Sequence, residues 1–311
     1  METINCVLCG GDGSADPIVI TENGWNGRQC KECGLIYISP RPSLEETIKL
    51  YSQDAVERYS EEFGACEDYL RYRSAYTVKK LMRYVKSGDL LEIGAAHGVF
   101  CEEVRKAGFK PFAIEFNPLE AASIVSLGIP CEQRPVHDAF PGLSFDAIYH
   151  CDLTSHLHDI VGDFRAMADR LRPGGIMIFE TGNLGDVRPK HYSLFSKFDY
   201  PDHLFFLSLK SLRLLIEKSG FEILSISSYS LLAQLAIRYL KKKVMGAPGS
   251  QRPVEGGDAG EPSAGAGGSR ASVKSRLKDY INFTLRYRMG RIMPSTHVPA
   301  TQIVVVRKAK S

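Results

Sequence analysis

The sequence predicts an α/β fold built on a doubly wound, mostly parallel sheet. From residue 89 onward, short apolar runs alternate with stretches of helical periodicity, which is the pattern of successive βαβ units. The predicted strands are 90–93, 112–115, 145–149, 176–179, 222–227 and 302–306. The helices expected between the earlier strands are 99–107, 118–127 and 160–171. In such a sheet a ligand binds beyond the carboxyl ends of the strands, so functional side chains are expected there.

The composition is that of an ordinary globular protein. Its 311 residues correspond to roughly two domains. The 44 % hydrophobic and 24 % charged shares exclude a chain disordered throughout and a polyelectrolyte. The net charge of +3 hides a division, because residues 1–230 carry a net charge of −8 and residues 231–311 one of +11. An anionic partner is therefore expected to meet the carboxyl-terminal part of the chain.

The amino terminus has neither the basic nor the apolar segment of a signal peptide. No apolar run reaches the ~18 residues needed to span a bilayer. We therefore expect a cytoplasmic protein with reduced thiols, with peripheral attachment to the inner face of the membrane as a variant.

Four cysteines of the first 40 residues form two C-x2-C pairs, Cys6/Cys9 and Cys30/Cys33, each followed by a glycine. A C-x2-C turn directs two thiolates at one point, and two such turns provide the four sulfur ligands that suit zinc. Because four protein ligands leave no open position, the site is expected to be structural. The alternatives are two unrelated cysteine pairs or redox-active thiols.

A glycine-rich turn follows the first predicted strand, in the sequence Leu91-Glu-Ile-Gly-Ala-Ala-His-Gly98. The next strand ends in Glu115, which is placed to bind the two hydroxyls of a ribose. Strand, turn, helix, strand and acid in this order indicate a cofactor that contains a nucleoside. Glu92 would repel a pyrophosphate but can receive an ammonium group, which favours S-adenosylmethionine over NAD.

These residues resemble motif I of class I S-adenosylmethionine-dependent methyltransferases, with Ala96 in place of the middle glycine. Phe145-Asp146, the turn 171–175 and the segment 200–208 are similar to later parts of that family. The paired cysteines and the following Ser-Pro-Arg-Pro-Ser resemble the zinc-ribbon methyltransferases of bacterial sugar and polysaccharide gene clusters. The resemblance implies a seven-stranded Rossmann-like methyltransferase fold and S-adenosylmethionine as cofactor.

The resemblance also implies roles for individual residues. Glu92 faces the methionine ammonium, Glu115 the ribose and Phe116 the adenine. The residues of the backbone cradle are Gly94, Ala95, Ala96 and Gly98. Those expected near the adenine nitrogens are Val136, His137 and Asp138. Cys151 is expected at the methyl-transfer end. The tyrosines at 59, 69, 72 and 76 either close over the methionine end or serve as packing residues.

Two histidines are candidates for the general base that removes a proton from the acceptor. His203 lies in Tyr200-Pro-Asp202-His203, which is similar to the Tyr-x-Glu-His element of zinc-ribbon sugar methyltransferases, with aspartate in place of glutamate. His156 follows the predicted strand 145–149. The alternative roles are a His203 that only holds a loop, and a metal site formed by His156, His158 and Asp152.

The chain is expected to divide into four parts. These are a zinc ribbon at 1–40, a helical lid or linker at 41–86, a cofactor-binding domain at 87–230 with 296–311, and a helical insertion at 231–295. In the insertion, a flexible glycine-rich linker is expected at 246–270 between two helices, 231–243 and 271–289. The second helix has an apolar stripe with basic flanks, which predicts either a peripheral membrane contact through 231–293 or a cap over the acceptor pocket.

The expected function is methyl transfer to a small-molecule, saccharide or lipid-linked acceptor. One alternative is methylation of rRNA or tRNA bases, with the ribbon recognising RNA, although Arg28 and Lys31 are the only basic residues in 1–40. A second alternative is a scaffold that keeps the fold without catalysis, which the presence of both Glu92 and Glu115 argues against. The oligomeric state does not follow from the sequence.

Overall fold

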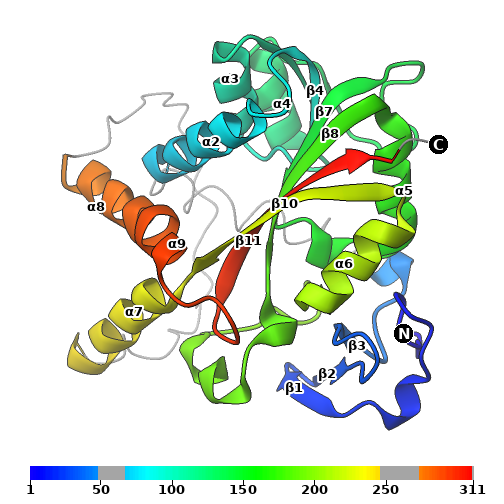
Figure 1. Ribbon diagram of the computed structural model, residues 1–311, viewed down its shortest axis with the longest axis vertical. Coiled ribbons are helices and arrows are strands. Elements are labelled where there is room, and N and C mark those ends of the chain that lie inside the picture. The colour runs from blue at the N-terminus through cyan, green and yellow to red at the C-terminus, as the bar shows by residue number, and fades with distance from the viewer. Residues whose placement is uncertain (48–66, 246–272, 310–311) are drawn as a thin grey trace, which may run out of the picture.

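Seven strands form the central sheet of the computed structural model, which describes residues 1–47, 67–245 and 273–309. The strand order is β10-β11-β8-β7-β4-β5-β6 (Figure 1). The strands are β4 (Gly88–Ile93), β5 (Phe109–Ile114), β6 (Cys131–Glu132), β7 (Phe145–Cys151), β8 (Leu171–Gly182), β10 (Phe221–Ser230) and β11 (Ala300–Lys308). All pairs from β8 to β6 are parallel, whereas β11 runs antiparallel to both neighbours. The predicted seven-stranded fold class is confirmed, and the short strand β6 is the one strand of this sheet whose residues were not predicted.

Helices cover both faces of this sheet, because alternate strand residues point to opposite sides. The helices are α2 (Glu67–Leu81), α3 (Val99–Lys106), α4 (Pro118–Ser126), α5 (Ile160–Arg170) and α6 (Leu209–Lys218). Met177 and Phe179 of β8 share one buried cluster with apolar residues of α5 and α6. Ile176 and Ile178 share the other cluster with residues of α2 and α3. The three helices predicted at 99–107, 118–127 and 160–171 are therefore present.

A second, four-stranded antiparallel sheet forms the amino-terminal ribbon. Its order is β1 (Ile18–Glu22), β2 (Trp25–Gln29), β3 (Ile36–Ile38) and β9 (Phe205–Phe206). The fourth strand comes from the segment between β8 and α6, so the ribbon sheet is completed by the domain that carries the large sheet. Short 3-10 turns occur at Gly13–Ala15, Thr154–His156, Leu184–Asp186 and Pro189–Leu194.

The insertion before the last strand is helical, as predicted. It contains α7 (Leu232–Met245), α8 (Val273–Phe283), a π-helical turn (Thr284–Met289) and α9 (Gly290–Ile292). The predicted linker at 246–270 and the part of the lid that holds Tyr59 lie outside the described residues. None of the helices in the described ranges combines the length and apolarity needed to cross a membrane.

Candidate active site

The glycine-rich turn joins β4 to α3 at the carboxyl edge of the sheet. Gly94 and Gly98 both have a φ of +71°, a backbone conformation that strongly favours glycine. A Cβ on Gly98 would also lie 3.2 Å from Cγ1 of Ile124 in α4. Ala96, which replaces the family's middle glycine, has a φ of +46° and so adopts the left-handed conformation as well. The predicted cradle therefore has the backbone shape of a tight turn.

Glu115 connects this turn to the end of β5. Its Oε2 accepts a hydrogen bond from the Ala96 amide at 2.8 Å, and its Oε1 accepts one from the Asn117 amide at 2.9 Å. A carboxylate has about four acceptor positions, so two bonds leave capacity for ribose hydroxyls. The two predicted cofactor segments, 94–98 and 115–116, are thus in direct contact.

Glu92 is a buried acid beneath the turn. It is 5 % exposed, and its Oε2 accepts a hydrogen bond from the Cys101 amide at 3.1 Å in the first turn of α3. Burial raises the pKa of Glu92 to about 8, although the Cys101 hydrogen bond and the Arg73 guanidinium both lower it. A cationic ligand group would favour the ionised carboxylate, so the site suits an ammonium.

The predicted adenine-side residues differ in exposure. The side chains of His137 and Asp138 are exposed, with His137 Nε2 lying 3.4 Å from Asp138 Oδ2, whereas Val136 is buried. Phe116 is 60 % exposed at the end of β5. An aromatic ring exposed to this extent next to Glu115 is available to a planar ligand.

A buried polar cluster at the carboxyl ends of β7 and β8 was missed in the sequence. Glu180 is fully buried, and its Oε1 accepts hydrogen bonds from Thr77 Oγ1 at 2.9 Å and Tyr149 OH at 3.3 Å. Its Oε2 accepts a hydrogen bond from Tyr287 OH at 2.7 Å. The only sequence signal is a single acid inside an otherwise apolar strand. Cys151, the predicted residue of the methyl-transfer end, follows Tyr149 by two residues.

Two arginines approach the same cluster from different helices. Arg73 belongs to α2, and Arg286 belongs to the insertion, where its Nη1 donates to Tyr69 OH at 3.1 Å. The Nε atoms of both arginines are buried without a hydrogen-bond partner among the described residues. Arg286 Nη2 also donates to Thr301 Oγ1, and the Glu180 carboxyl lies in the same cluster as both guanidinium groups. Tyr72 and Tyr76 instead pack edge-on or tilted against Phe283 of α8.

The two candidate bases lie side by side. The ring centroids of His156 and His203 are 4.7 Å apart, and His156 Nδ1 lies 3.3 Å from Asp202 Oδ1. His203 Nδ1 lies 2.9 Å from the Phe198 carbonyl oxygen, which can only accept, so this nitrogen carries the proton and Nε2 is the acceptor. Burial, and then the neighbouring His156, lower the pKa of His203.

Comparison with known families identifies the chain. A family model described as a methyltransferase domain matches residues 69–226, just over half of the sequence. The chain belongs to this methyltransferase family. It is therefore an S-adenosylmethionine-dependent methyltransferase, as the residues of the glycine-rich turn predict. No curated protein matches the methyltransferase.

Three solved structures are similar to the chain, and the first of them supports the fold. A chain of the complex between the Haloferax volcanii Trm112 methyltransferase activator and its companion protein has a TM-score of 0.52 at 12 % identity, covering 84 % of the methyltransferase and 98 % of that chain. A SAM-dependent methyltransferase from Archaeoglobus fulgidus has a TM-score of 0.46 at 13 % identity, covering 76 % and 94 %. Coclaurine N-methyltransferase has a TM-score of 0.45 at 12 % identity, covering 76 % and 72 %.

Tyr200 of the methyltransferase packs against the ribbon. It is 2 % exposed, and a Cβ on Gly27 of β2 would collide with its hydroxyl. The hydroxyl has no hydrogen-bond partner among the described residues, and burial raises the pKa of Tyr200 well above its ordinary value. This environment fits a packing role, so Tyr200 is not used in the reaction proposed below.

The ribbon holds the segment that carries His203. Glu22 of β1 accepts hydrogen bonds from the amides of Phe198 and Tyr200, both at 2.8 Å, one on each carboxylate oxygen. The Ile38 amide donates to the Leu204 carbonyl at 3.1 Å, and the Leu204 amide donates to the Ser155 carbonyl at 2.7 Å. One chain of backbone contacts therefore runs from the ribbon through the His203 segment to the His156 turn.

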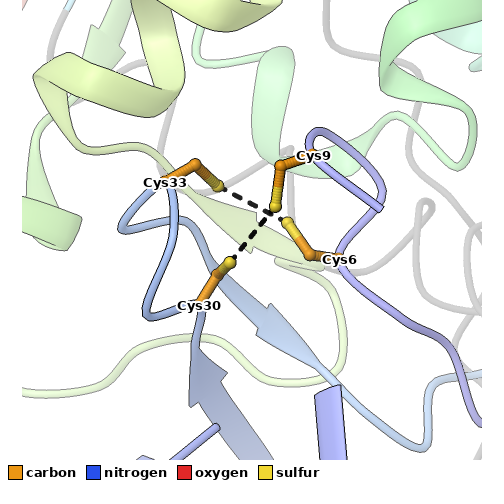
Figure 2. A group of neighbouring side chains, drawn as sticks. All are labelled: Cys6, Cys9, Cys30 and Cys33. Carbon is orange, nitrogen blue, oxygen red and sulfur yellow. Dashed lines mark hydrogen bonds between the residues drawn. The ribbon is translucent and has the colours of Figure 1, made fainter. Parts of the chain in front are cut away.

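The four ribbon cysteines converge on one point between two turns (Figure 2). Their sulfur atoms all lie within 4.8 Å of one another, with Cys6 and Cys33 at 3.5 Å and Cys9 and Cys30 at 3.4 Å. Tetrahedral zinc with bonds of about 2.3 Å places its sulfur ligands about 3.8 Å apart, so the arrangement fits this ion. His156, His158 and Asp152 do not form such a group. In the described ranges, the four cysteines are the only group of side chains placed to hold a metal ion.

Proposed function

We propose that this enzyme transfers a methyl group to a small-molecule, saccharide or lipid-linked acceptor, with His203 as the general base. The observation that carries the proposal is the pair formed by His203 and His156. The His156 turn directly follows β7, which pairs in parallel with β4, so it lies at the same edge of the sheet as the glycine-rich turn. A base at this edge meets the acceptor where the methyl group is delivered.

The proposed cofactor site uses residues that fit S-adenosylmethionine. The buried Glu92 would hold the ammonium group, the backbone of 94–98 would receive the methionine part, and Glu115 would hold the ribose. Phe116 and residues 136–138 would border the adenine. When bound, S-adenosylmethionine supplies an electrophilic methyl group on a sulfonium sulfur. The enzyme's own part is to align the acceptor and to accept its proton.

His203 suits proton transfer because its lowered pKa keeps the ring neutral at pH 7. The Phe198 carbonyl fixes the tautomer and leaves Nε2 to take the proton of an acceptor hydroxyl or amine. Asp202 contacts His156 and so orients the His156 ring, which lies next to His203.

We further infer that the four cysteines bind one structural zinc ion. The spacing of the sulfur atoms supports this assignment. Metal analysis of the purified protein should find one zinc per chain, and a variant with Cys6→Ser and Cys33→Ser should hold none. A chain purified without zinc that keeps the ribbon fold would contradict the assignment.

RNA as the acceptor receives less support. In the ribbon, Arg28 donates to the carbonyls of Ser39 at 3.4 Å and Asp16 at 3.1 Å, so this basic group is used inside the ribbon. An RNA path needs basic side chains directed outward along it.

The proposed function is tested by following a tritiated methyl group from S-adenosylmethionine into fractions of a cell extract. Label in a lipid, saccharide or small-metabolite fraction is expected with the wild-type enzyme. His203→Gln should reduce the transfer about 10²–10³-fold, since a general base contributes this order of rate. His191→Gln, a histidine outside the pair, is the matched control. Label confined to RNA, or equal transfer by His203→Gln, would contradict the proposal.

A further inference from the structure

Exposed apolar side chains gather on the helices of the insertion. Of 17 large hydrophobic residues exposed in the described part of the chain, eight belong to α7, α8 and the turns up to α9. They are Ile237, Leu240, Val273, Leu277, Tyr280, Ile281, Met289 and Ile292. Figure 1 shows these helices together at one side of the molecule, away from the ribbon strands β1–β3.

Helix α8 has two different apolar faces. Its inner face packs on α2, with the Phe283 ring centroid 5.8 Å from that of Tyr72 and 5.9 Å from that of Tyr76. Its outer face shows Val273, 84 % exposed, and Leu277, 58 % exposed, one helical turn apart. The inner face thus accounts for folding, and the outer face has no partner among the described residues.

The segment between α7 and α8 lacks the side chains to cover this face. Residues 246–272 are rich in glycine, alanine, serine and proline, and their only large aliphatic residue is Val254. Covering several exposed aliphatic residues requires comparable apolar area from the other side. The occupant is therefore expected from outside this segment.

Basic residues border the outer face. Lys274 and Lys278 are exposed on α8, and Arg288 and Arg291 are exposed beyond it. Two copies of this face would bring like charges together, whereas an anionic surface would complement them. Because residues 231–311 carry a net charge of +11 and residues 1–230 one of −8, the rest of the protein would be turned away from such a surface.

We propose that the outer face of α7–α9 docks on a bilayer that contains anionic lipids. An amphipathic helix with aliphatic residues between lysines binds at the interface through apolar burial and attraction to anionic headgroups. The same segment sends Arg286 and Tyr287 into the polar cluster at the carboxyl edge of the sheet. Docking therefore sets the active site beside the membrane surface, where a lipid-linked acceptor would reach it. The docking itself is independent of the proposed function; only the choice of acceptor depends on it.

Co-sedimentation with vesicles tests this proposal on the full chain. We expect binding to vesicles of phosphatidylcholine with 30 % phosphatidylglycerol, weaker binding in high salt, and little binding to phosphatidylcholine alone. The double variant Leu277→Ser/Ile281→Ser should bind about tenfold or more weakly, since two exposed aliphatic chains are lost. Val125→Ser/Leu143→Ser is the matched control, because these residues are 55 % and 41 % exposed elsewhere on the surface.

Charge reversal provides an independent variant. Lys274→Glu/Lys278→Glu alters only exposed side chains, and binding to anionic vesicles should fall about tenfold or more. Affinity for S-adenosylmethionine should be unchanged in every variant, so loss of docking is distinguishable from failure of the active site. Absence of wild-type binding to anionic vesicles, or equal binding by either insertion variant, would overturn the proposal. A dimer that Leu277→Ser/Ile281→Ser dissociates would assign the face to a second copy instead.

Discussion

The rings of His156 and His203 lie with their centroids 4.7 Å apart, although 46 residues separate them in the sequence. Each ring has a polar contact that orients it: Asp202 contacts His156, and the Phe198 carbonyl contacts His203. The two contacting groups come from the same segment, which the ribbon holds through Glu22. The proposed base is therefore positioned by contacts that reach from the ribbon to the end of β7.

The pH dependence of the reaction should report His203. Burial lowers the pKa of His203 below the ordinary histidine value of about 6.5, so the neutral base is present at pH 7 and is lost only as the pH falls through that lower value. The acid limb of kcat/KM is expected below pH 6.5. In His156→Gln this limb should move upward, because His156 is one of the groups that lower the pKa of His203. A limb above pH 6.5 in the wild type would contradict this assignment.

Removing the contact from the ribbon should affect turnover but not cofactor binding. Glu22→Gln replaces one of the two carboxylate oxygens that accept hydrogen bonds from backbone amides of the His203 segment. We expect kcat to fall about tenfold. Hydrogen exchange at residues 198–208 should speed up. Glu32→Gln, an exposed glutamate of the same ribbon, is the control. Unchanged exchange together with unchanged kcat would show that the ribbon does not position the histidines.

Zinc removal should unfold the ribbon first. Trp25 in β2 is the only tryptophan of the chain, so its fluorescence reports this small sheet. Chelation is expected to shift the emission to the red, since metal binding supplies much of the folding energy of such a module. Hydrogen exchange in β3 and β9 should rise together, because these strands are paired. An unchanged emission after the metal is fully removed would contradict a structural role.

Glu115 should matter for both the turn and the cofactor. Glu115→Ala removes the acceptor of the Ala96 amide and the proposed partner of the ribose. Affinity for S-adenosylmethionine should fall about tenfold or more, with a lower Tm of the ligand-free protein. Glu222→Ala, an exposed glutamate at the start of β10, is the control. Equal affinity in the Glu115 variant would refute the ribose assignment.

The sequence predicted the elements that depend on local pattern. The strands and helices of the large sheet, the turn 94–98 and the converging cysteines all follow from short motifs and periodicity. A capping box at Ser43 is another local feature: the Glu46 carboxylate accepts a hydrogen bond from the Ser43 amide at 2.8 Å, and Ser43 Oγ accepts one from the Glu46 amide at 3.3 Å.

Contacts between distant segments could not be predicted in this way. β9 is only two residues long, and it exists because the Leu204–Phe206 backbone meets β3, far away in the sequence. Glu180 meets Thr77 and Tyr287 at separations of 103 and 107 residues, and no local motif encodes that meeting. In the sequence, Arg286 is one of several basic residues that flank the apolar stripe of a helix. In the structure its side chain is directed inward, where it donates a hydrogen bond to Tyr69.

The central claim is that the carboxyl edge of the large sheet binds S-adenosylmethionine, with Glu92 against the ammonium group. Calorimetry at pH 7, in buffers of different ionisation enthalpy, tests this claim most directly. Because the pKa of Glu92 is about 8 in the ligand-free protein, its carboxyl is mostly protonated at this pH. Binding should therefore occur at one site with net release of protons, and Glu92→Gln should abolish that release. Absence of binding, or binding with no proton released, would contradict the account.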